Sequence, residues 1–290
     1  MSIIFNTSMR HIEFFDIDHF EKKYFRVKPP PSIAHFIDFI WETDFDDLLE
    51  KYPRGFSDAL FPNIGYTYLI NLGTPYIMQV DKKSFDMKGD GFLPRHKSIE
   101  CYHRQGNKLF GIKFNISPVI FQKKINFSEY RNHIYPLSYL IDSDVITNIK
   151  KAASFDERVQ IVVKYFTEIV TKYSGSLKPI QIVTEILDHC NRENDFGISI
   201  ENVSKKYKIS SRTLQRHFET VTSISSKTAL QIMRIRKATH HLATSPADFN
   251  YSLYGYYDQS HFYKHLKQFL QKELLMDLQL HLKLVKKKTT

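Results

Sequence analysis

The spacing of apolar residues changes along the chain, and the change predicts two regions of different structure. In the first half apolar and polar residues alternate, as they do over residues 109–116, which is typical of strands with one buried face. Residues 64–71 and 76–80 show the same pattern, separated by a turn that contains Gly73 and Pro75. Short strands at such intervals predict a compact antiparallel sheet, barrel or sandwich.

In the second half the apolar residues recur every three or four positions, which is the period of a helix. A stripe of valine, isoleucine and phenylalanine predicts one helix over residues 155–173. The segment 174–178 breaks this helix, and Pro179 suits the first turn of the next one. We therefore predict two domains, one over residues 1–174 and one over residues 179–290.

A helix-turn-helix pattern lies in the second region, between Ser199 and Phe218. Ser199 is a good N-cap for a first helix over residues 200–207, and a serine after the turn caps the second helix. Leu214 and Phe218 are four residues apart, so both lie on one face of this second helix, and we expect that face to be buried.

The opposite face of the second helix is then polar and carries Arg212, Gln215 and Arg216. Arginine can bind guanine, and glutamine adenine, through paired hydrogen bonds in the major groove of DNA. The competing interpretation is an ordinary solvated helix face. Charge favours DNA, because residues 179–290 hold 17 Lys and Arg against 10 Asp and Glu in a chain of net charge +10.

Several sequence pieces in this region resemble the AraC/XylS family of bacterial transcription regulators. The resemblance covers about residues 180–270, and the final run of its pieces is especially specific. In chain order the pieces are Ser199-Ile200-Glu201, Ile209-Ser210, Leu214-Gln215-Arg216 with Phe218, Arg234-Ile235-Arg236 with Ala238, and Gly255-Tyr256-Tyr257-Asp258-Gln259-Ser260-His261-Phe262.

The resemblance implies an all-α domain of two helix-turn-helix units joined by a linker helix over residues 226–242. Their two recognition helices enter the major groove about one DNA turn apart. In the first unit it implies the three residues named above as DNA contacts. In the second unit Tyr251 stands where alanine is typical, so we expect the first unit to read bases and leave open whether the second binds mainly phosphates. The implied contacts of the second unit are Gln259, Ser260, Tyr263 and Lys264.

The N-terminal half of proteins in this family often resembles a small β-barrel that senses a ligand, mediates dimerisation, or both. We therefore predict an α+β protein whose N-terminal antiparallel β-barrel or cupin-like domain, with helices, precedes the DNA-binding domain. A weaker prediction places aromatic residues around a ligand pocket, although core packing would explain the same residues. These are Trp41, Tyr66, Tyr68 and Tyr102.

Other classes of function find little support in the chain. Cys101 and Cys190 stand in no metal-binding or disulfide spacing, and no close His-x-His pair is present, so we predict no metal or cofactor. The sequence contains no recognisable combination of catalytic residues, which argues against an enzyme. Charged residues near the N-terminus argue against a signal peptide, and no apolar run is long enough to span a membrane.

We therefore expect a cytoplasmic transcription regulator, with activation or repression left open. Its expected partners are double-stranded DNA, RNA polymerase, a small-molecule effector and, through the helix at residues 155–173, a second copy of the chain. The main alternative is a constitutive DNA-binding or protein-interaction module without a small ligand. A further alternative is an enzyme whose helical region targets it to DNA.

Overall fold

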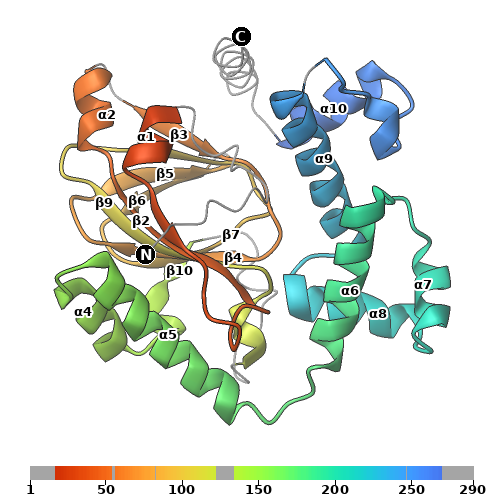
Figure 1. The fold of residues 1–290 in the computed structure, drawn as a ribbon, viewed down its shortest axis with the longest axis horizontal. Helices are drawn as coiled ribbons and strands as arrows, with labels where there is room; N and C mark the ends of the chain where they lie inside the picture. The colour runs from red at the N-terminus through yellow and green to blue at the C-terminus, as the bar shows by residue number, and fades with distance from the viewer. Residues whose placement is uncertain (1–16, 54–55, 82, 122–133, 246, 270–290) are drawn as a thin grey trace.

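The computed structural model describes residues 17–53, 56–81, 83–121, 134–245 and 247–269. In these ranges a region of antiparallel strands, the sheet region, precedes a helical region that begins at residue 178 (Figure 1). The predicted α+β class is thereby confirmed. None of the described helices combines the length and apolar character that crossing a bilayer requires.

Two antiparallel sheets make up the sheet region, and their strand pairings do not close into a barrel. The predicted barrel-like domain is thus built from two open sheets. The six-stranded sheet has the order β1 (Phe25–Val27), β2 (Ile37–Asp44), β9 (Lys108–Phe114), β4 (Tyr66–Asn71), β7 (Gly91–Pro94) and β10 (Tyr135–Pro136). The four-stranded sheet has the order β3 (Ser57–Leu60), β8 (Ile99–Tyr102), β5 (Tyr76–Val80) and β6 (Lys83–Met87).

Strand β9 lies inside the larger sheet and is buried on both faces, whereas its alternating sequence predicted one buried face. Phe110, Ile112 and Phe114 on one face belong to the larger apolar core. Leu109, on the other face, belongs to a smaller core with residues of β5, β7 and β8. Both faces are covered because the second sheet lies on one side and helices on the other.

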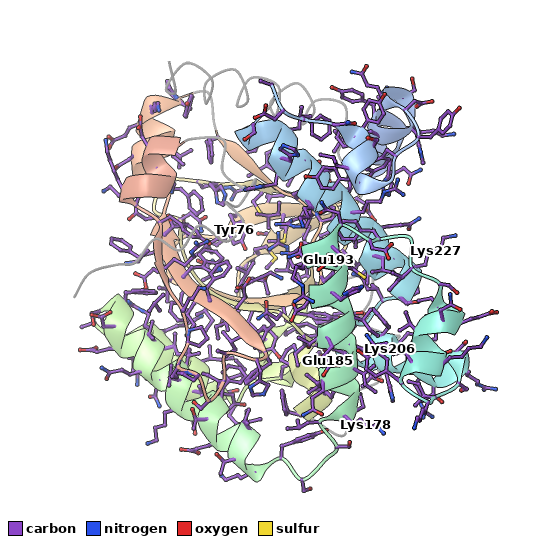
Figure 2. All side chains as sticks on the ribbon, turned by 45° about the vertical axis from the view of Figure 1, so that its right-hand side comes forward. Tyr76, Lys178, Glu185, Glu193, Lys206 and Lys227 are labelled. Atoms are coloured by element: carbon purple, nitrogen blue, oxygen red, sulfur yellow. The ribbon has the colours of Figure 1, made fainter. Side chains whose placement is uncertain are left out.

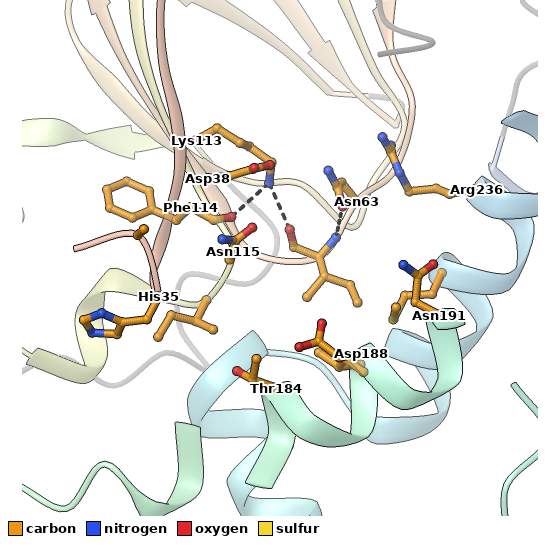
Figure 3. A pocket seen from close by; sticks show the side chains of 15 residues that line it. His35, Asp38, Asn63, Lys113, Phe114, Asn115, Thr184, Asp188, Asn191 and Arg236 are labelled. Atoms are coloured by element: carbon orange, nitrogen blue, oxygen red, sulfur yellow. Dashed lines mark hydrogen bonds between the residues drawn. The ribbon is translucent and has the colours of Figure 1, made fainter. Parts of the chain in front are cut away.

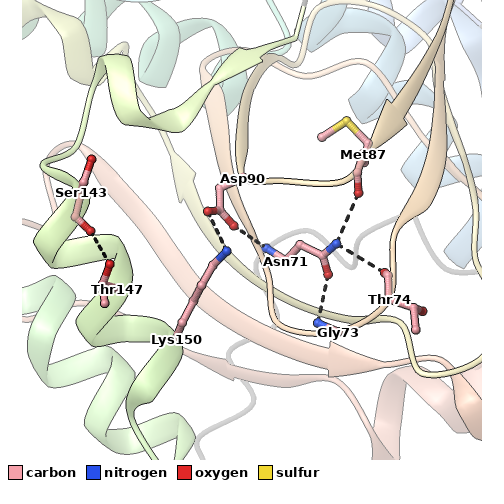
Figure 4. A network of polar contacts seen from close by, with 8 residues as sticks. All are labelled: Asn71, Gly73, Thr74, Met87, Asp90, Ser143, Thr147 and Lys150. Carbon is pink, nitrogen blue, oxygen red and sulfur yellow. Dashed lines mark hydrogen bonds and ion pairs between the residues drawn. The ribbon is translucent and has the colours of Figure 1, made fainter.

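Helices α4 (Ser143–Lys151) and α5 (Phe155–Lys172) follow the sheets and cover the larger core (Figure 1). Lys150 on α4 forms an ion pair of 2.9 Å with Asp90, whose other carboxylate oxygen accepts a hydrogen bond from the backbone N–H of Asn71 (Figure 4). The Asn71 side chain also accepts from the N–H of Gly73 and donates to the carbonyl of Met87. One polar network therefore fixes α4 to the sheet.

The helical region closely follows the predicted boundaries. Ser226 begins α9, as predicted for the linker helix. The second unit differs from expectation, because the described residues between α9 and α10 form a 3₁₀ turn in place of an α-helix. The α-helices are α6 (Lys178–Glu193), α7 (Ile200–Lys206), α8 (Ser211–Thr222), α9 (Ser226–Thr244) and α10 (Gln259–Phe269). The remaining short elements are α1 (Ile17–Lys22), α2 (Asp46–Lys51), η1 (Pro118–Phe121), η2 (Leu137–Tyr139) and η3 (Tyr251–Tyr254).

The sheet and helical regions touch through specific contacts as well as apolar packing. Arg236 on α9 is almost fully buried and donates hydrogen bonds to the backbone oxygens of Phe61 (3.0 Å) and Pro62 (2.9 Å). The backbone N–H of Ser117 donates to the oxygen of Val221 at the end of α8. Residues of both regions belong to one continuous apolar cluster. The helical region is therefore attached to the sheets through α8 and α9.

Candidate nucleic-acid interface

Local capping builds the first helix-turn-helix unit, α7–turn–α8. The Ser199 hydroxyl accepts the N–H of Asn202 at the start of α7, and the Ser210 hydroxyl accepts the N–H of Thr213 at the start of α8. Each serine thus satisfies a backbone donor that has no partner inside its helix. Lys208 in the turn has a φ of +53°, a left-handed conformation that redirects the chain sharply between the helices.

The inner face of α8 carries the two residues that the sequence placed there. Leu214 and Phe218 are both fully buried, and Val221 extends the same face. Burial of a leucine or phenylalanine side chain stabilises a fold by about 1.5–3 kcal/mol, so this face anchors α8 firmly. The orientation of α8 about its own axis is therefore set by its apolar residues, and the opposite face is left to solvent.

Arg212 and Arg216 lie on that outer face and are exposed. The end of α7 and the turn after it add three exposed lysines that the sequence interpretation did not include, namely Lys205, Lys206 and Lys208. Figure 2 marks Lys206 in this part of the helical region. The sequence run Lys205-Lys206-Tyr207-Lys208 could have indicated these basic residues, because its three lysines lie close together. Together these five cations form a basic surface of the kind that attracts phosphate groups.

His217, which follows Arg216 on α8, also lies near cations. His217 is half-buried on α8, and its pKa is lowered, first by burial and then by the nearby charges of Arg216 and Lys178. The two cations lie on different helices, α8 and α6.

Gln215 is placed differently from its two arginine neighbours. Its side chain is half-buried, and its oxygen accepts hydrogen bonds from the hydroxyl (2.9 Å) and the N–H of Ser226 at the start of α9. Its nitrogen donates to the Glu219 carboxylate at 3.2 Å. The amide therefore links α8 to α9. To bind a base, it would first have to exchange these partners.

The second unit presents α10. Gln259, Ser260 and Lys264 are exposed, and Tyr263 is half-buried with its ring against Phe262. As in α8, the inner face is apolar, with Phe262 and Leu266 buried. The Asp258 carboxylate accepts the N–H of His261 at 2.6 Å, in the first turn of α10.

The segment before α10 is compact and aromatic instead of helical. Asn250 caps η3 by accepting the N–H of Ser252, and Gly255 follows with a φ of +70°. Tyr257 comes next and is 89% exposed beside the start of α10, a position that sequence reasoning did not single out.

The four aromatic residues predicted to line a ligand pocket are not brought together. Tyr66 and Tyr68 are core residues, 1% exposed and packed against Phe92. Tyr102 is 39% exposed at the surface. Trp41 stacks on Tyr24 and lines a cavity of only about 30 Å³, close to the space of a single water molecule.

A larger cleft of about 380 Å³ lies between the two regions (Figure 3). Thr184 and Asp188 on α6 border one side, and Asn63 and Asn115 of the sheet region border the other. At its rim the buried Lys113 ammonium donates to the backbone oxygens of Ile64 (2.9 Å) and Phe114 (3.2 Å). Arg236, which joins α9 to the sheets, lines the same cleft.

A close backbone approach shapes this rim. Gly65 has a φ of +87°, and a Cβ there would lie 2.3 Å from the backbone oxygen of Phe114. Any other residue would push the loop after β3 away from the end of β9. The loop that accepts the hydrogen bonds of Lys113 and Arg236 is therefore held close to the sheet.

Comparisons with known proteins found similarity only at the level of structure. No protein-family model and no curated protein matches the chain. ToxT from Vibrio cholerae is 10% identical, with a TM-score of 0.43 over 88% of this chain and 99% of its own. A ToxT structure with bound unsaturated fatty acid is 9% identical, with a TM-score of 0.42 over 86% and 92%. The AraC-like transcriptional activator CuxR is 10% identical, with a TM-score of 0.29 over 76% and 88%.

Proposed function

We propose that this chain is a sequence-specific DNA-binding transcription regulator of the AraC/XylS type, acting in the cytoplasm. The observation that carries the proposal is the first helix-turn-helix unit. Its recognition helix α8 is anchored by buried Leu214 and Phe218 and presents Arg212 and Arg216 to solvent, beside three exposed lysines. Arginine at this place can read guanine in the major groove, while the lysines bind phosphates.

The proposal assigns residues 179–290 to DNA binding, with α8 as the principal reader of bases. Gln259, Ser260, Tyr263 and Lys264 on α10 supply the second contact. The proposal also assigns a DNA contact to Gln215, whose side chain links α8 to α9. A test replaces Arg212, Gln215 and Arg216 together by alanine and measures affinity for a duplex that the wild-type chain selects from a random library. The triple variant should bind it no better than random DNA; a retained preference would refute the assignment.

Residues 1–174 are proposed as a sensor and dimerisation domain that a small molecule controls. The cleft supports this part, because its 380 Å³ approaches the size of small-molecule sites, whereas the cavity beside Trp41 has about 30 Å³. A ligand there would touch both α6 and the loop held by Arg236, and so would act on the two regions at once.

A thermal-shift screen of metabolites on the whole chain tests this control. Stabilisation by a hit should disappear in Thr184→Phe, which fills the cleft, and persist in Tyr102→Ala, a matched surface change in the smaller sheet. A hit lost only in Tyr102→Ala would favour the aromatic residues as the site. A flat screen would favour the alternative function, a constitutive DNA-binding module.

The remaining partners complete the proposal. A regulator bound beside a promoter would recruit or position RNA polymerase. A second copy of the chain would pack along α5, where Ile161, Val163 and Ile169 are only half-buried. Sedimentation of the whole chain over a range of concentrations tests dimerisation, and the variant Ile161→Glu should shift the equilibrium to monomer.

A further inference from the structure

Three consecutive residues of α9 point to three different parts of the molecule. Arg234 donates a hydrogen bond to the backbone oxygen of Gly255 in the second unit. Ile235 is fully buried in the apolar core, and Arg236 donates to the sheet region. Successive residues of a helix are about 100° apart, so one short run can hold three neighbours at once.

The contact of Arg234 reaches further than one hydrogen bond. Its guanidinium carbon lies 3.7 Å from the centroid of the Tyr256 ring, well inside the range of a cation–π interaction. Tyr256 is 2% exposed, and burial raises the pKa of its hydroxyl, which therefore stays protonated. Gly255, with its left-handed backbone, brings the carbonyl and the ring to the same guanidinium.

From Tyr256 the path continues into the second recognition helix. The Tyr256 hydroxyl and Nδ1 of His265 are 2.6 Å apart, and His265 is a buried residue of α10. The Tyr256 ring also packs edge-on against Phe262 of the same helix. A continuous set of contacts thus runs from Arg234 on α9 through the turn to the middle of α10.

The two units differ in what lies before the second helix of each. In the first unit a full helix, α7, stands before the turn and is joined to α8 by the hydrogen bond between Ser204 and Ser211. In the second unit the described residues between α9 and α10 form the four-residue η3 in place of an α-helix. Phe249 packs against Phe262 of α10, and Arg234 adds a contact from the linker helix through Gly255 and Tyr256.

We propose that Arg234 is the positioning residue of the second recognition helix. Through Gly255 and Tyr256 it sets where α10 lies relative to α8, and thus whether both helices can reach DNA together. Arg234 itself needs no contact with DNA. The proposal rests on the proposed DNA-binding function, and it adds the element that aligns the two units.

The test compares Arg234→Met with Lys237→Met in the whole chain. Both variants remove a half-buried cation of α9 that donates to a backbone oxygen, but Lys237 donates to Asn191 of α6. The probe is the duplex that the wild-type chain selects from a random library, examined by hydroxyl-radical footprinting. The wild-type chain should protect two segments about one DNA turn apart.

Arg234→Met should keep the segment covered by α8, lose the other, and bind the duplex about tenfold more weakly, since a cation–π contact and a hydrogen bond are both removed. Lys237→Met should keep both segments. Arg234→Lys retains the cation and should be intermediate. Tyr256→Phe, which keeps the ring but breaks the contact with His265, should also weaken the second segment.

Three outcomes would overturn the proposal. In the first, Arg234→Met protects both segments as the wild-type chain does. In the second, Arg234→Met and Lys237→Met lose protection equally, which would indicate a general loss of structure. In the third, the wild-type chain protects the α8 segment alone, so α10 has nothing to align. Failure of the proposed function looks different, because the wild-type chain would then select and protect no sequence.

Discussion

The two proposed DNA-binding units each present a helix with a polar outer face, α8 and α10, but hold these helices by different means. In the first, serine caps, a left-handed turn residue and a buried α8 face assemble the unit from residues close together in sequence. In the second, α10 depends on Arg234, Tyr256 and an aromatic segment that stands in place of a helix. The difference teaches that an exposed helix face can be supported either by local capping or by a contact between residues far apart in sequence.

The largest difference in stability between the two units should appear when the buried phenylalanine of each unit is replaced. Phe218 and Phe262 are both fully buried on the inner faces of their helices. Phe218→Ala should lower the free energy of unfolding by about 3–5 kcal/mol, because α8 packs into the core shared with the sheets. Phe262→Ala should mainly release α10.

Urea unfolding and hydrogen exchange distinguish these two results. The comparison breaks down if Phe262→Ala removes exchange protection from α7 and α8 as strongly as Phe218→Ala does, because the two units would then unfold as one.

Acid should weaken the second unit. Burial, with smaller effects from Arg234 and His261, lowers the pKa of His265 from 6.5 to about 4. Because the folded pKa lies below the unfolded one, the unfolded chain takes up the proton first as pH falls. The neutral histidine therefore contributes its full stability above about pH 6.5 and loses it as pH falls toward 4, at no more than about 1.4 kcal/mol per pH unit.

Exchange protection of α10 measured between pH 7 and pH 4.5 checks this expectation. The difference in protection between the wild-type chain and His265→Asn should shrink as the pH falls. A difference independent of pH would mean that His265 does not titrate in this range.

A smaller effect should distinguish Gln215 from Arg212 within the first unit. Gln215→Ala removes the bonds to Ser226 and should cost about 1 kcal/mol of stability, the usual contribution of a hydrogen bond. Arg212→Ala alters an exposed side chain and should stay within about 0.5 kcal/mol. Chemical denaturation of both variants measures this. Equal values would show that the Gln215 bridge adds nothing.

The sequence predicted those structural features that depend on residues close together along the chain. Strand β5 occupies the predicted residues 76–80, and α9 begins at the predicted Ser226. The inward face of α8 also follows from the four-residue spacing of Leu214 and Phe218. Caps and periodicity act within one or two turns, so a single sequence contains the information that they need.

Features that depend on distant residues could not be predicted in the same way. The bond from Gln215 to Ser226 requires α9 to fold back beside α8, and the cleft exists only because α6 faces the loop after β3. The burial of both faces of β9 likewise depends on a second sheet. The hydrogen bond from Arg234 to Gly255 likewise joins residues that are 21 positions apart.

The central proposal is that α8 of the first unit is the principal reader of bases, whereas Lys264 on α10 of the second unit binds phosphate. The most direct test measures affinities of Arg216→Ala and Lys264→Ala for the selected duplex and for random DNA at several salt concentrations. Arg216→Ala should lose most of its preference for the selected duplex, at a cost of about 1–3 kcal/mol. Lys264→Ala should weaken both affinities evenly and reduce the salt slope by about one. The opposite pattern, with preference lost in Lys264→Ala and kept in Arg216→Ala, would contradict the account.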